Sequence, residues 1–237
     1  MNTGARRAIV LAGASAALCV LVVSALLWAW RAAEFRLNTN LKTLAMGYRF
    51  YAVEHDGVLP ELDAEPGVLS GNADTLYPRY VFDTGLLFSP PHAEDGAMAR
   101  EQASARDAFR GSSYVYLGRP VASDDEVLEW SREYLDFVAA AGEHRLRHKP
   151  WRLKEGEVYK VPLLIELPRP YPGTWGLSVL GRYLPLSSPE MGGCVAYADG
   201  HVEFIRYPGE WPMTAVTIDA LRRAKAIGMK DAAHANP

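Results

Sequence analysis

The stretch CVAYADGHVEFI, residues 194–205, decides the fold, because it places a turn signal between two apolar runs. Asp199-Gly200 is a dipeptide that two-residue type I′ hairpin loops prefer, since both central residues need a positive φ. We therefore predict an antiparallel β-hairpin with its loop at these two residues. His201 then lies beside the turn on the solvent side.

In this register the apolar side chains of both strands share one face, because cross-strand partners point the same way. That face consists of Val195, Tyr197, Val202 and Phe204. His201 and Glu203 fall on the opposite face, together with Ala196 and Ala198.

The acidic and imidazole groups near the turn also suggest a chemical alternative. Asp199, His201 and Glu203 are residue types found in acid–base pairs and metal sites, but neighbours in sequence form no site without matched partners elsewhere. The chain also lacks the common nucleophile, zinc, phosphate-loop and dinucleotide motifs. We expect no catalytic residue, metal site or cofactor. An anchored hydrolase or metal enzyme around these three residues is the weakest alternative.

The amino terminus carries an uncharged run. Residues 1–7 contain Arg6 and Arg7, and residues 8–30 then contain no charged side chain. A helix of that length spans roughly 35 Å, enough for a hydrocarbon core of about 30 Å. The run predicts a transmembrane helix after a short cytoplasmic amino terminus, with the lipid bilayer as a partner.

The helix is predicted to continue through residues 31–55, where one face is apolar. The helix packing face recurs at spacings of 4, 3, 4 and 3 and consists of Leu37, Leu41, Leu44, Tyr48 and Tyr51. Gly57 suits a left-handed cap, and Pro60 blocks continuation. We expect this face to pack against a soluble domain.

Residues 56–226 are predicted to form that domain, followed by a flexible tail at 227–237. Ser123 and Glu126 match a capping box that opens an amphipathic helix. Residues 158–167 have the composition of a strand, and residues 214–226 resemble a closing helix. The net charge of -3 gives no electrostatic reason to bind nucleic acid.

Three segments together resemble the type II secretion pseudopilins and related prepilin-like proteins. Residues 40–60 are similar to the NLK-L…Y…DG…P run that leaves their membrane helix, and residues 76–90 to their LYPKY…F-CP segment, with Ser89 in place of Cys. Residues 192–202 look like the motif of prepilin-like proteins described by His, nine residues, then Asp-Gly. Pro189 occupies that His position.

This resemblance implies an α+β, pilin-like fold, with a long amino-terminal helix packed on an antiparallel sheet. It implies a non-enzymatic structural or interaction protein of a secretion or pilus-type system. The partners would be other pilin-like subunits or secretion-machine proteins. It places the chain in the bacterial inner membrane with an extracytoplasmic domain. The alternative is an anchored module that binds a polysaccharide or an envelope protein through the loops at residues 63–72 and 169–176.

Overall fold

The computed structural model describes residues 3–89, 104–139, 161–170, 177–179, 182–184 and 191–234. The chain divides into two compact units, Met1–Arg36 and Leu37–Pro237. Helix α1 (Thr3–Glu54) is continuous across this boundary. The part of α1 from Leu37 onward belongs to the second unit.

The carboxy-terminal part of α1 buries one side in the core. Leu41, Leu44 and Tyr48 are each at most 1% exposed, and Tyr51 packs against the same cluster while partly buried. The helix ends where the pattern predicts, because Gly57 has φ 82° and its N–H donates to the Ala52 carbonyl at 2.7 Å. Such an αL residue satisfies a terminal carbonyl of the helix.

The transmembrane prediction is wrong for the part of the chain that is described, where no helix is both long enough and apolar enough to cross a bilayer. This finding overturns the predicted membrane span at residues 8–30, the single-pass placement in a bacterial inner membrane and the division into a cytoplasmic terminus and an extracytoplasmic domain.

The described strands confirm the α+β class. Five of them form an antiparallel sheet: β1 (Tyr114–Val115), β2 (Pro162–Glu166), β3 (Arg169–Pro170), β6 (Met191–Tyr197) and β7 (Val202–Arg206). β6 pairs with β2, β3 and β7, and β1 pairs with β2. The register of β2 on β6 shifts between Pro162 and Leu164, as expected where proline lacks the ladder N–H. β4 (Leu177–Val179) and β5 (Arg182–Leu184) form a separate pair.

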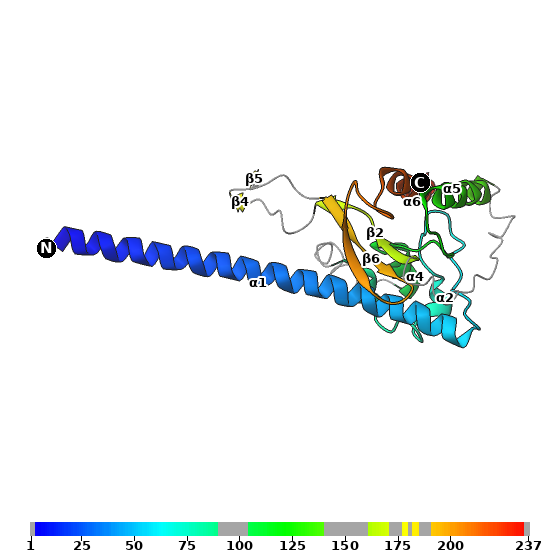
Figure 1. The fold of residues 1–237 in the computed structure, drawn as a ribbon, viewed down its shortest axis with the longest axis horizontal. Coiled ribbons are helices and arrows are strands. Elements are labelled where there is room, and N and C mark those ends of the chain that lie inside the picture. Colours follow the sequence, from blue (N-terminus) through cyan, green and yellow to red (C-terminus); the bar gives the residue numbers. More distant parts are fainter. Residues whose placement is uncertain are drawn as a thin grey trace. The chain divides into compact units, whose positions relative to one another are not determined.

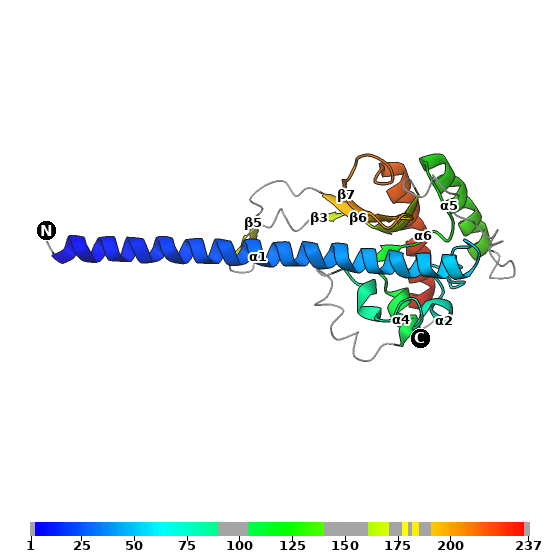
Figure 2. The ribbon, with the colours of Figure 1, turned by 60° about the horizontal axis from the view of Figure 1, so that its bottom comes forward.

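In the globular unit the sheet lies between α1 and a second helical layer (Figure 1). That layer is formed by α5 (Asp124–Ala139) and α6 (Ala215–His234), which pack on each other. Figure 2 shows the carboxy-terminal part of α1 passing in front of the middle of α6. Shorter helices, α2 (Ala73–Leu76), η1 (Thr84–Leu87) and α4 (Ala105–Arg110), connect the layers.

Helix α5 forms as its cap signals predict. The Glu126 N–H donates to the Ser123 hydroxyl at 3.3 Å, and the Glu126 carboxylate accepts from the Ala122 N–H at 2.7 Å. Its apolar stripe is buried in the core and consists of Val127, Trp130, Tyr134 and Phe137. Helix α6 continues to His234, beyond the predicted end at residue 226.

A carboxylate on β2 is buried beside β6. Glu166 is 3% exposed, and it accepts hydrogen bonds from the Ser89 hydroxyl at 2.9 Å and from the Cys194 N–H at 3.1 Å. Burying a charged group is costly unless its hydrogen bonds are made. Ser89, which stands where the resembled family has Cys, thus supports a buried polar contact.

Candidate interaction surfaces

The hairpin exists, but its predicted register is wrong by one residue. Tyr197 pairs with His201: its N–H donates to the His201 carbonyl at 3.0 Å, and the Gly200 N–H donates to the Tyr197 carbonyl at 2.9 Å. The loop therefore contains three residues, with Gly200 at φ 94°. Asp199 is not among the described residues with positive φ, whereas a type I′ loop would need a positive φ there.

The shift in register changes which side chains share a face. The pairs are Ala196 with Val202, Val195 with Glu203 and Cys194 with Phe204. Because side chains alternate along a strand, a slip of one residue moves one strand's whole set to the other face. The predicted apolar face of both strands is thus wrong, and Tyr197 shares its face with His201 and Glu203.

The turn itself is bound to α1. Arg49, on α1, donates a hydrogen bond to the Asp199 carbonyl. The Asp199 carboxylate accepts from the His201 N–H at 2.9 Å and contacts His201 Nδ1 at 2.6 Å. The His201 ring stacks on Tyr197 with ring centroids 4.2 Å apart. Burial acts to raise the pKa of Asp199, but the hydrogen bonds from His201 outweigh it and lower that pKa.

The polar groups at this turn bond mainly to one another and to α1. Within the described ranges, no group of three or more His, Cys, Asp or Glu residues could hold a metal ion. Asp199 and His201 satisfy each other, and Glu203 lies on the strand opposite Val195. The polar groups of Asp199 and His201 thus fix the turn, whereas the Glu203 carboxylate makes no contact with it in the described part of the chain.

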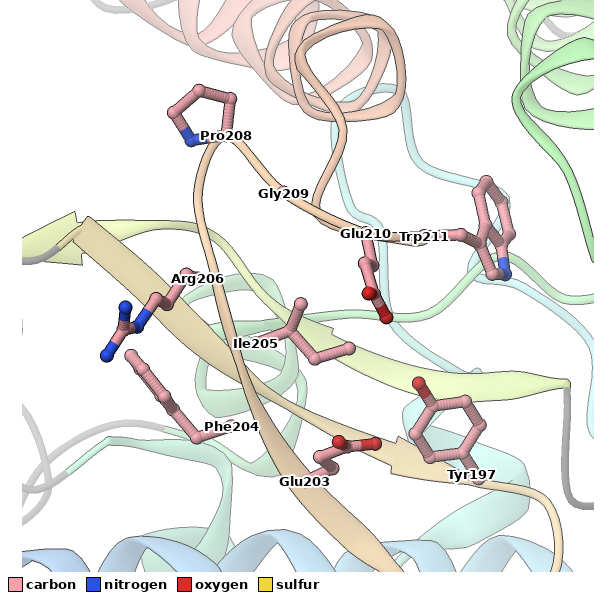
Figure 3. A pocket seen from close by; sticks show the side chains of 9 residues that line it. All are labelled: Tyr197, Glu203, Phe204, Ile205, Arg206, Pro208, Gly209, Glu210 and Trp211. Atoms are coloured by element: carbon pink, nitrogen blue, oxygen red, sulfur yellow. The ribbon is translucent and has the colours of Figure 1, made fainter.

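Beside the turn is a groove that the sequence did not indicate. It has a volume of about 460 Å³ and is lined by Tyr197, Glu203, Phe204, Ile205, Arg206 and residues 208–211. We call it the β7 groove. In Figure 3 the carboxylates of Glu203 and Glu210 and the phenol of Tyr197 point toward the same space.

The carboxylates around the groove affect the pKa of Tyr197. The pKa of its phenol is raised to about 12, mainly by burial and also by the carboxylates of Glu203, Asp199 and Glu210, which disfavour another negative charge. The three-residue loop produces this arrangement, since the predicted register would have turned Glu203 to the other face. Only the register, and not the residue composition, could have revealed the groove.

The second surface lies on α1, opposite the helix packing face. Of that predicted face, Leu41, Leu44, Tyr48 and Tyr51 contribute to the core, while the side chain of Leu37 is outside the described residues. On the other side, Met46, Phe50 and Val53 are 42%, 58% and 78% exposed. We call these three residues the α1 stripe. Their spacings of 4 and 3 place them on one side of the helix.

The predicted binding loops are only partly described. Residues 63–72 are ordered by a hydrogen bond from the Asp63 N–H to the Ser70 carbonyl at 2.9 Å and by one from the Gly67 N–H to the Tyr134 hydroxyl at 2.7 Å. Leu69 in this loop is buried in the core. Residues 171–176 of the second loop lie outside the described residues.

No protein-family model, curated protein or solved structure matches this chain. The resemblance to pseudopilins therefore stays a prediction that rests on the sequence motifs alone.

Proposed function

We propose that this chain is a non-enzymatic structural or interaction protein, a divergent pseudopilin-like subunit of a secretion or pilus-type system. The α1 stripe is the observation that carries this proposal. A helix that buries one face in its own domain and exposes apolar side chains on the other can pack that second face against another protein.

The exposed side chains are large enough to matter for association. Phe50 and Val53 are more than half exposed, and each buried methylene removed from water contributes about 0.8 kcal/mol. Single exposed apolar residues are ordinary, but a row of them at helical spacing is typical of a binding site. Tyr80 and Val81 lie close to α1 because Gly47 on that helix has no side chain. Phe82 directly follows them and is 69% exposed.

The amino-terminal unit also exposes apolar side chains. Leu18, Val20, Leu21, Trp28 and Phe35 are between 63% and 75% exposed. Exposed apolar side chains gathered on one helix are typical of a surface that packs against another element. This supports helix-to-helix contact with another pilin-like subunit as the mode of interaction.

The helix-on-sheet layering supports the pilin-like part of the proposal. The helix packing face of α1 lies against a core that includes the β6 residues Cys194, Val195 and Ala196, as the resemblance implies. The groups around Asp199 and His201 are used in the turn, which supports a protein without a catalytic role.

Sedimentation velocity of the full chain over a range of concentrations tests this proposal. We expect the wild-type chain to self-associate, and the double variant Phe50→Glu/Val53→Glu to do so at least about tenfold more weakly, because charge opposes burial of the stripe. Leu135→Glu is the matched control, since Leu135 on α5 is 38% exposed and lies outside the stripe. Equal association of the wild type, the double variant and the control would contradict the proposal.

A further inference from the structure

Two carboxylates from different segments meet at the β7 groove. Glu203 extends from β7, and Glu210 from the connection to α6 (Figure 3). In the part of the chain that is described, neither carboxylate takes part in a side-chain hydrogen bond or ion pair. Arg206 also lines the groove, but its guanidinium points away from both of them in Figure 3. Two carboxylates against one guanidinium leave the lining of the groove with a net negative charge.

The rest of the lining is aromatic and aliphatic. Tyr197 and Trp211 stand on the side of the groove near Glu210, and Ile205 lies between the two acids (Figure 3). An ammonium or guanidinium group gains from aromatic faces as well as from carboxylates. The aliphatic stem of a lysine or arginine also gains from apolar surface. The combination suits a long basic side chain.

We propose that the β7 groove binds a lysine or arginine side chain carried on a segment of a protein partner. This inference rests on the proposed function, whose partner it specifies. A volume of about 460 Å³ exceeds what one ammonium group fills. Pro208 and Ile205 leave apolar wall for the residue beside the basic one, which favours a peptide segment over a small free cation.

A peptide array probes this site directly. The full-length chain is incubated with pentapeptides that have lysine, arginine, norleucine or glutamate at the centre and varied apolar neighbours. Affinities of the best binders are then measured by calorimetry, with butylamine as the small-cation probe. We expect lysine- and arginine-centred peptides to bind and their affinity to fall as salt rises. We expect norleucine- and glutamate-centred peptides not to bind.

Variants assign the binding to the groove. Glu203→Gln and Glu210→Gln should each weaken binding about fivefold, and the double variant about twentyfold, as exposed ion pairs do. Glu129→Gln, an exposed acid on α5, should leave it unchanged. Each substitution is nearly isosteric, and circular dichroism of each variant verifies the fold.

Four results would overturn the inference: no binding of any basic peptide, equal binding of the norleucine series, butylamine binding as tightly as the peptides, or an equal loss in Glu129→Gln. The proposed function has an independent test. If stripe variants weaken self-association while basic peptides fail to bind, the groove inference is wrong and the subunit proposal stands.

Discussion

β6 and β7 are consecutive strands connected by a three-residue hairpin loop, yet they lie in different surroundings. β6 has β2 and β3 on one side and β7 on the other, and its residues from Gly192 to Tyr197 are buried. Along β7, Glu203 and Arg206 are exposed and the residues between them are half-buried. The inner strand is fixed by packing on both sides and both faces, whereas the outer strand can present functional side chains.

The comparison predicts that equivalent changes cost most on the inner strand. In Gly193→Val on β6, the new Cβ would lie 2.3 Å from the Glu166 carbonyl oxygen. Backbone atoms there cannot move without breaking the pairing with β2, so we expect a loss of about 3 kcal/mol in the free energy of unfolding. Urea denaturation followed by circular dichroism measures it. Glu203→Val on β7 is the counterpart, with a change within about 0.5 kcal/mol. Equal losses would remove the distinction between the strands.

The loop between the strands should show an intermediate effect. Gly200→Val forces a β-branched residue to φ 94° and places its Cβ 2.9 Å from an Arg49 nitrogen. We expect a loss of about 1–2 kcal/mol by the same denaturation measurement. Gly200→Asn should lose less, because asparagine tolerates positive φ. A valine variant as stable as the wild type would mean that the loop relaxes to another conformation.

The attachment of the hairpin to α1 should contribute less again. Arg49→Ala removes the hydrogen bond to the Asp199 carbonyl, and we expect a loss of about 0.5–1 kcal/mol. Hydrogen exchange of the loop amides should quicken while that of β6 stays protected. Lys42→Ala, another exposed cation on α1, should change neither. Faster exchange throughout β6 would show that the link holds the whole sheet.

The smallest expected effect is electrostatic and local to the outer strand. Glu203→Gln removes a carboxylate that helps to raise the pKa of Tyr197 to about 12, so that pKa should fall. Since the folded pKa exceeds the ordinary 10.0, this group's stabilising contribution is complete below pH 10 and is lost as pH rises toward 12. A titration of the tyrosine ring carbon by NMR follows the phenol. An unchanged pKa would place Glu203 too far away to act on the groove.

The helices could be predicted from the sequence because their signals are local. The spacing of Leu41, Leu44 and Tyr48 and the glycine at 57 define one end of α1, and Ser123 and Glu126 define the start of α5. Periodicity and caps involve residues within a few positions of each other, so they can be recognised without knowledge of distant contacts. The membrane prediction, which depended on the uncharged run at residues 8–30 and on the resemblance, was overturned.

The hairpin shows what the sequence leaves open. Asp199-Gly200 fits both a two-residue loop and a three-residue loop with Gly200 in a bulge, and the two differ by one residue in register. The choice depends on contacts from distant residues, such as Arg49 on α1. The β7 groove depends in turn on that register, so neither its position nor its two carboxylates could be recognised before the three-dimensional arrangement was known.

The hydrogen bond from Arg49 ends on the main chain at position 199, not on a side chain. Any amino acid at that position would offer the same carbonyl, so substitutions of the aspartate can leave the tether intact. The Arg49 guanidinium, in contrast, is a side-chain donor that most other residues cannot replace. Among relatives of this chain, Arg49 should therefore vary less than Asp199, although Asp199 is the residue that belongs to the turn motif.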